Sequence, residues 1–249
     1  MGFWIIAGLA AFVLGLSKGG MPVVAILSVP LMSLYMDPAL AAGLLLPLYL
    51  VADVYAIYLF RRDFSVRNLA ILLPAAPLGV LGGYFAVTVV STDATKLLLA
   101  AIGLSYIARS VTNRLRSRTV PARPADVPRG VIWGAVAGLT SYIAHAGGPP
   151  YQTYVLPQKL DKMVYLGTTA IFFAAVNLMK LPAYILADQL DWASVAQAAW
   201  LAPFALAGAF SGAKISRWLP DKVFFALIEL ALAVVSVKLL VEGVTGLLN

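Results

Sequence analysis

The stretch Ser17-Lys18-Gly19-Gly20-Met21-Pro22 interrupts an apolar run near the start of the chain, and His145-Ala146-Gly147-Gly148-Pro149-Pro150 interrupts another in the second half. The first glycines of the two stretches are 147 − 19 = 128 residues apart, and their closing prolines share this offset. Two pairs of aspartates follow it as well, Asp63 with Asp191 and Asp93 with Asp221. These matches indicate an internal duplication.

The composition is that of a polytopic membrane protein. Of the 249 residues, 61% are hydrophobic and only 12% are charged, and the mean hydropathy is +0.90. The absence of cysteine excludes disulfides, thiol catalysis and Cys-ligated clusters, and a single histidine excludes a multi-histidine metal site within one chain. The net charge of +7 lies between apolar segments, so no nucleic acid is expected as a partner, and no cofactor is implied.

The apolar segments predict an all-α polytopic membrane protein made of two inverted repeats of about five helical segments each. The expected segments are roughly 3–16, 21–36, 38–60, 69–90, 96–112, 131–145, 149–157, 163–187, 193–214 and 222–246. The first two of each half are too short to cross a bilayer comfortably. They form either a broken, re-entrant hairpin at the Gly/Pro motif or short tilted helices, and three full spans follow. The matched aspartates lie at helix starts, where we expect N-terminal caps.

Positive charge predicts the orientation, because cytoplasmic loops carry an excess of Lys and Arg. Most of the 18 basic residues lie in 61–68, 109–130 and 157–162, so we expect these segments in the cytoplasm. Both termini would then be periplasmic or extracellular, and the two halves would start on opposite sides. The expected division is a first membrane repeat over 1–112, a basic cytoplasmic linker over 113–130 and a second membrane repeat over 131–249.

Paired Gly/Pro breaks at corresponding points of two membrane repeats are the best sequence pointer to a transporter's binding site. Unwound backbone is tolerated in a membrane only inside protein or along a wet cavity. A new helix is expected to begin just after each break, at Pro22 and at Pro150, with free N–H groups and a partial positive charge suited to an anion. Lys18 adds a full charge and His145 a titratable one. The alternative is that the glycines only allow close helix packing.

The candidate substrate-binding residues are the two breaks and polar side chains that can donate to anion oxygens. They are Lys18, Gly19, Gly20, Met21, Pro22, His145, Gly147, Gly148, Pro149, Pro150, Gln152, Tyr154, Asn177 and Lys180. Lys180 lies within an apolar segment, where charge is costly and usually functional. The offset places Asp53 beside it, since 181 − 53 = 128. Either the two form an ion pair between the halves, or Lys180 faces the substrate while Asp53 handles a coupling cation or proton. Asp53, His145 and Glu229 are the candidates for coupling or gating.

Two stretches resemble the TauE/SafE family of sulfite exporter-like permeases. They are Gly15-Leu16-Ser17-Lys18-Gly19-Gly20 and the run from Gly147 to Gln158, which reads GGPPYQTYVLPQ. The resemblance covers nearly the whole chain. It implies movement of small organosulfur or sulfur-oxyanion substrates, such as sulfite, and a location in the bacterial inner membrane. It implies no catalytic residue.

Three classes of function are compared. The leading hypothesis is a secondary transporter that moves a small anion, sulfite or an organosulfonate, by alternating access, with proton coupling as a further hypothesis. The second is a passive anion channel with the same binding site. The third is a membrane-embedded enzyme, although the sequence shows no nucleophile–base pair and no metal site is expected. The expected partners are a small anion, the lipid bilayer and a coupling proton or cation, and both a monomer and a homodimer remain open.

Overall fold

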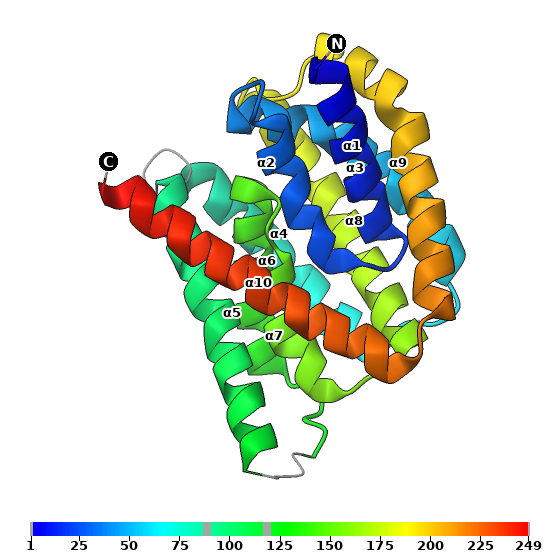
Figure 1. The fold of residues 1–249 in the computed structure, drawn as a ribbon, viewed down its shortest axis with the longest axis vertical. Helices are drawn as coiled ribbons and strands as arrows, with labels where there is room; N and C mark the ends of the chain where they lie inside the picture. The colour runs from blue at the N-terminus through cyan, green and yellow to red at the C-terminus, as the bar shows by residue number, and fades with distance from the viewer. Residues whose placement is uncertain (1, 87–90, 117–120, 249) are drawn as a thin grey trace.

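The computed structural model describes residues 2–86, 91–116 and 121–248, and within these ranges all regular structure is helical (Figure 1). The elements are α1 (Gly2–Lys18), the 3-10 helix η1 (Pro22–Leu27), α2 (Ser28–Met32), α3 (Pro38–Phe60), α4 (Val66–Ala86), α5 (Thr92–Leu115), α6 (Val127–Ala144), α7 (Gly148–Val155), the 3-10 helix η2 (Leu156–Gln158), α8 (Lys162–Leu186), α9 (Trp192–Trp218) and α10 (Asp221–Leu248). The all-α polytopic fold predicted from the sequence is confirmed.

Six of the described helices are long and apolar enough to cross a membrane, namely α3, α4 and α5 in the first half and α8, α9 and α10 in the second. This confirms the expectation of three full spans after each break. Large apolar side chains cover their outer faces, as a lipid environment requires, with Trp200 on α9 and Val234 on α10 largely exposed. Several of these helices contain proline, which neighbouring helices make tolerable at membrane depth.

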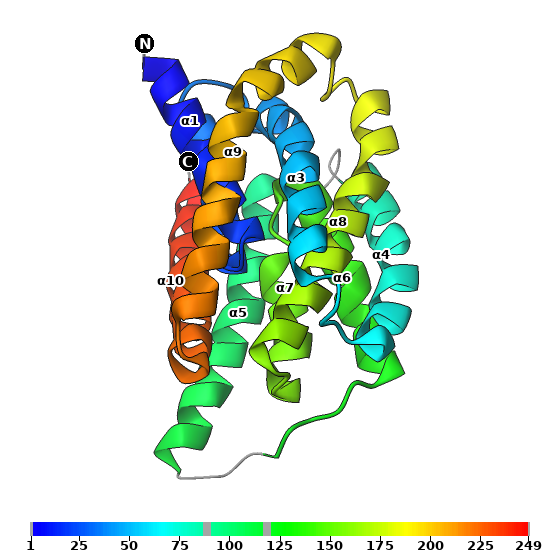
Figure 2. The same cartoon turned by 90° about the vertical axis from the view of Figure 1, so that its right-hand side faces the viewer.

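The packing partners of the first half reappear in the second when each helix is replaced by its equivalent 128 residues away. The most extensive contacts join α1 to α9 and α4 to α6, which are equivalent pairs, while α3 packs on α8 and α5 on α10. Figure 2 shows α1 starting at the top of the view, and α6 starting at the bottom, where the connection from α5 arrives. The inverted repeat remains a prediction, which this exchange of partners supports.

The segments expected in the cytoplasm meet at one end of the molecule. The backbone N–H of Arg123 donates to Pro157 O over 2.9 Å. The side-chain amides of Asn68 and Gln158 donate to each other, both over 2.9 Å, and Lys162 Nζ lies 3.0 Å from Asp221 Oδ1. Segments that share one side of a membrane must be able to touch, and these do. Residues 117–120 of the predicted linker 113–130, including Arg118, lie outside the described residues.

The aspartates matched by the offset lie at helix starts with different roles. Asp191 caps α9, because its carboxylate accepts a hydrogen bond from Ser194 N over 2.7 Å. Hydrogen bonds from the side chain and the backbone of Ser194 lower the pKa of Asp191 below its usual value. Asp93 and Asp221 lie within the first turns of α5 and α10, where a negative charge is favourable. Asp93 is not the expected cap, because Ser91 Oγ accepts from Ala94 N at the start of α5. For Asp63 the expected cap is wrong: Ser65 Oγ accepts from Asn68 N at the start of α4.

Small residues let the two main helix pairs approach closely, as is common in membranes. A side chain at Gly208 of α9 would collide with the backbone of Phe12 in α1, and one at Gly79 of α4 with the backbone of Ala135 in α6. Gly82, three residues along α4, is different, since a methyl group there would meet only Leu139 Cδ1, at an ordinary 3.6 Å. Glycine is therefore required at some positions of these interfaces and not at others.

We expect Gly79→Ala to lower the stability of the purified protein and Gly82→Ala to leave it unchanged or raise it. Both substitutions gain about 1 kcal/mol of helix propensity, but only the first pushes α4 away from α6, at a cost of about 1–3 kcal/mol. The measurement is the thermal unfolding temperature in detergent. Equal melting temperatures for the two variants would contradict the close α4–α6 contact.

Candidate functional site

The two breaks come together inside the bundle. After α1 ends at Lys18, Gly20 adopts a φ of 127°, which a residue with a side chain rarely reaches. In the second half, α6 ends at His145 in the left-handed region with φ 49°, and the N–H groups of His145 and Ala146 return to Ser141 O and Thr140 O. The segments that follow, η1 and α7, contact each other. Sequence positions far apart thus form one site.

The helix starts after the breaks offer fewer hydrogen-bond donors than the sequence suggested. The first break is followed by a 3-10 helix of six residues, not an α-helix. In the second, α7 begins at Gly148, two residues earlier than Pro150 suggested, and Pro149 and Pro150 have no N–H to donate. Charged and polar side chains must therefore provide more of any anion site than helix ends do.

A cavity lies between the two breaks. It is lined by Ser17, Lys18, Gly20, Pro22, Ala25, Tyr49, Phe60, Ser141, His145, Gly148, Leu166, Thr169, Ala170, Phe173 and Asn177. Its volume, counted as the space open to the centre of a water molecule, is about 50 Å³. At about 10–15 Å³ for each water, this is room for roughly four waters or one small oxyanion.

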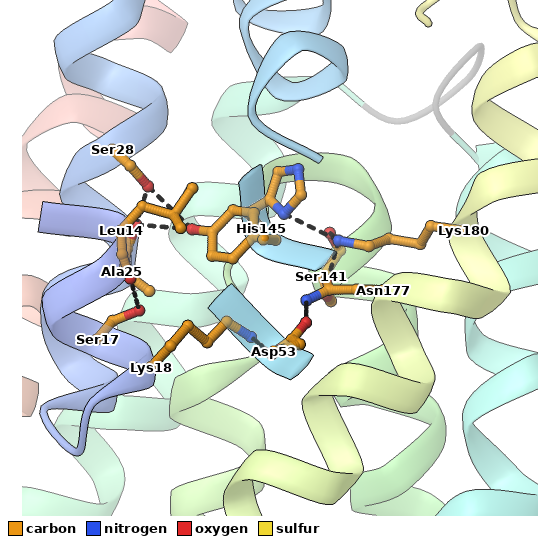
Figure 3. Close-up of polar contacts among 11 residues, drawn as sticks. Leu14, Ser17, Lys18, Ala25, Ser28, Asp53, Ser141, His145, Asn177 and Lys180 are labelled. Carbon is orange, nitrogen blue, oxygen red and sulfur yellow. Dashed lines mark hydrogen bonds and ion pairs between the residues drawn. The ribbon is translucent and has the colours of Figure 1, made fainter. Parts of the chain in front are cut away.

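Lys18 forms a buried ion pair at the edge of this cavity (Figure 3). Its Nζ lies 2.6 Å from Asp53 Oδ1, and Asp53 Oδ2 accepts a hydrogen bond from Asn177 Nδ2 over 2.7 Å. The ammonium also lies 5.0 Å from the ring centre of Tyr49 and 5.9 Å from that of Phe173. The structure therefore pairs Asp53 with Lys18, whereas the sequence suggested Lys180.

Lys180 approaches from the opposite side and makes a second buried cluster (Figure 3). Its Nζ lies 2.9 Å from His145 Nδ1, 3.2 Å from Ser141 O and 3.3 Å from Ser141 Oγ. Lys180 is fully buried, while Ser141 and His145 border the cavity. Lys180 thus lies one layer behind the cavity wall and orients the groups that form it.

His145 is fixed on several sides. Because Ala42 O can only accept, the ring Nε2 donates to it over 3.1 Å and carries the proton. The ring stacks on Tyr49 with centroids 4.7 Å apart. Tyr184, which donates to Tyr142 O over 2.7 Å, packs edge-on against the same ring. These contacts hold a non-glycine residue in a backbone conformation that ordinarily costs about 1–3 kcal/mol.

The four glycines of the breaks divide between packing and cavity. A side chain at Gly19 would collide with the backbone of Ala209, and a Cβ at Gly147 would lie 2.7 Å from Ala137 O, so both serve close packing. Gly20 and Gly148 border the cavity. Nothing lies within 4 Å of a Cβ placed on Gly148. In each pair, one glycine therefore serves close packing and the other borders the cavity, where a role in substrate binding stays a prediction.

The remaining predicted residues lie apart from the cavity or behind its wall. Met21 borders a second, apolar pocket against α10, and Pro149 and Pro150 are buried in the first turn of α7. Gln152 is buried further along α7. Tyr154 donates to Asp126 O over 3.1 Å near the start of α6. Glu229 lies between α5 and α10, where Tyr106 Oη is 3.5 Å from its Oε1.

Sequence reasoning missed several uncharged residues of the cavity wall, although the offset of 128 could have found some. Ser17 corresponds to His145 (145 − 17 = 128) and Tyr49 corresponds to Asn177 (177 − 49 = 128), and all four border the cavity. Gly20 and Gly148 are a third such pair (148 − 20 = 128). Thr169 and Phe173 have no comparable sequence signal, because they lie in an unbroken apolar run.

A family model described as Sulfite exporter TauE/SafE matches residues 3–239, a range that contains both breaks and every residue of the cavity wall. The chain belongs to the TauE/SafE family. This confirms the resemblance noted in the two break motifs, and it identifies the chain as a membrane permease of a transporter family. No curated protein and no solved structure gives a significant match. Membership in the TauE/SafE family does not by itself assign a role to any individual residue.

We expect Lys18→Met to destabilise the protein by about 3–5 kcal/mol, because it leaves Asp53 as a buried charge without its cation. Replacing both partners, as Lys18→Met with Asp53→Leu, should recover most of the loss. The control is Lys96→Met, which breaks the half-exposed pair with Asp93 and should cost at most about 1 kcal/mol. Denaturant titration in detergent micelles measures all three. A double variant as unstable as Lys18→Met would contradict a mutual ion pair.

Proposed function

We propose that this protein is a secondary transporter that moves a small sulfur oxyanion or organosulfonate across the bacterial inner membrane by alternating access. The observation that carries the proposal is the cavity between the two breaks, with the ammonium of Lys18 at its edge, in a member of a sulfite exporter family. Periplasmic termini follow from the charge distribution and belong to the same proposal. Proton coupling is part of it as well.

The charges around the cavity support an anion as the substrate. Two lysines, Lys18 and Lys180, lie at or behind the cavity wall, against the single carboxylate of Asp53 among the residues described at this site. A site with more basic than acidic groups in a low-dielectric interior attracts negative charge. Asn177 at the wall has a second amide N–H beyond the one that it donates to Asp53. The volume favours a compact oxyanion over a long-chain organic acid.

The packing supports alternating access around this cavity. Each half contributes one break and one long central helix to the site, α3 from the first and α8 from the second, and these two helices pack on each other. The larger helix pairs, α1 with α9 and α4 with α6, each combine one helix from either half. Rocking of one such pair against the other would open the cavity to either side in turn.

The proposal predicts that Gly148→Ala impairs transport without destabilising the protein. The added methyl group enters open cavity space and meets no neighbour within 4 Å, so it competes with the substrate and not with the fold. We expect at least a tenfold fall in kcat/KM for sulfite uptake into proteoliposomes, a loss of about 1.4 kcal/mol of binding.

Gly82→Ala, the same chemical change on α4, is the matched control and should transport as the parent protein does. Sulfite uptake by Gly148→Ala equal to that of Gly82→Ala would contradict the proposed site. Uptake that never saturates and cannot be driven against a gradient would replace the transporter with a passive channel.

A further inference from the structure

We propose that Asp53 occupies the anion position at Lys18 in the empty site and gives it up on taking a proton, so that one proton accompanies each bound anion. The inference rests on the proposed anion transport and deepens it, since it assigns the group that carries the coupled proton and the number of protons for each anion. Two observations support it: the carboxylate of Asp53 is paired with the ammonium of Lys18, and Lys18 borders the cavity.

The carboxylate of Asp53 already fills the place that a substrate would take. Lys18 is the charged side chain that borders the cavity among the described wall residues, and its Nζ lies 2.6 Å from Asp53 Oδ1. Asp53 is only 2% exposed, so bulk water does not screen it. An anion bound at Lys18 would therefore face a second negative charge at short range in a poorly screened interior. Two such anions at one cation strongly favour protonation of one of them.

A proton on Asp53 resolves this conflict with little rearrangement. The neutral carboxyl group can still accept the hydrogen bond from Asn177 Nδ2 that now reaches Oδ2. A proton on Oδ1 removes the negative charge of Asp53 and so ends the ion pair with Lys18. The ammonium of Lys18 then becomes available to an anion in the cavity. On release of the anion, the proton leaves Oδ1 and the ion pair with Lys18 re-forms. For a substrate with a single negative charge, the bound pair of anion and proton adds no net charge to the site.

The other titratable groups near Asp53 are less suited to this role. Lys18 on α1 and Lys180 on α8 are cations, and Tyr49 on α3 is held by Ser28 over 2.9 Å. His145 at the end of α6 donates from Nε2 to Ala42 O, and a proton on its Nδ1 would confront Lys180 Nζ at 2.9 Å. On α9 and α2, which also pack on α3, the buried positions carry no ionisable side chain.

Glu229, the remaining acidic candidate, lies between α5 and α10 beside Tyr106. It borders neither Lys18 nor the described cavity wall. This makes Glu229→Gln a matched control for Asp53→Asn, because each replaces one carboxyl group by the amide of the same shape.

The test is the affinity of the full-length protein in detergent for sulfite between about pH 5 and pH 8, measured by calorimetry on the parent protein, Asp53→Asn and Glu229→Gln. Sulfite changes its own protonation in this range, but equally for all three proteins. Relative to Asp53→Asn, the parent should lose affinity about tenfold more for each pH unit above the point where Asp53 ionises. Asp53→Asn should bind sulfite at high pH more tightly than the parent, and Glu229→Gln should follow the parent. Methanesulfonate, whose charge is constant, serves as the second probe.

A second measurement follows the proton directly. Methanesulfonate added to the parent protein in weakly buffered solution above that pH should withdraw one proton from the medium for each anion bound, and Asp53→Asn should withdraw none. Sulfite or methanesulfonate binding by the parent with the same pH dependence as Asp53→Asn, and no proton uptake, would overturn the coupling and leave anion transport standing. If neither anion binds the parent or Asp53→Asn at any pH, the proposed function itself is wrong and the coupling falls with it.

Discussion

The buried ion pair between Lys18 and Asp53 is the constraint around which the site is organised. Charges removed from water are costly unless they are paired and hydrogen-bonded, and this pair draws on three elements: Lys18 from the end of α1, Asp53 from α3 and Asn177 from α8. The break at Gly19-Gly20 ends α1 at Lys18, which places the ammonium beside the negative end of its own helix. The break therefore places the charged end of Lys18 in the interior of the helix bundle.

Lys180 meets the same requirement in another way. Its three hydrogen-bond contacts go to the carbonyl and hydroxyl of Ser141 and to His145 Nδ1, so its donors are used within the protein. Lys18 instead depends on one carboxylate and two aromatic rings. The two lysines, which look alike in the sequence, thus differ in how readily a ligand could reach them. Lys180 lies behind the cavity wall, whereas Lys18 borders the cavity.

The sequence predicted the architecture well because hydrophobic length and an exact repeat offset are strong, long-range signals. The three spans after each break and the meeting of both breaks at one place followed from them. The partner of Asp53 was harder to predict, because offset equivalence relates positions in the two halves and does not say which of them touch. Lys18 and Asp53 belong to the same half, whereas Asn177 comes from the other. Tyr154 and Gln152 do not line the cavity, because proximity to a break in sequence does not place a side chain there.

The two breaks are alike in sequence but differ in whether their second glycine can be replaced by a larger residue. At Gly20 the backbone torsion excludes other residues, and a Cβ would also lie 2.5 Å from Ser216 Oγ. At Gly148 the backbone is ordinary and the neighbouring space is empty. A change of one residue at Gly148 can therefore reshape the binding space while the fold stays intact, whereas the matching change at Gly20 cannot. Of these two equivalent positions, the one in the second half is where the size of the binding space can be altered at little cost to folding.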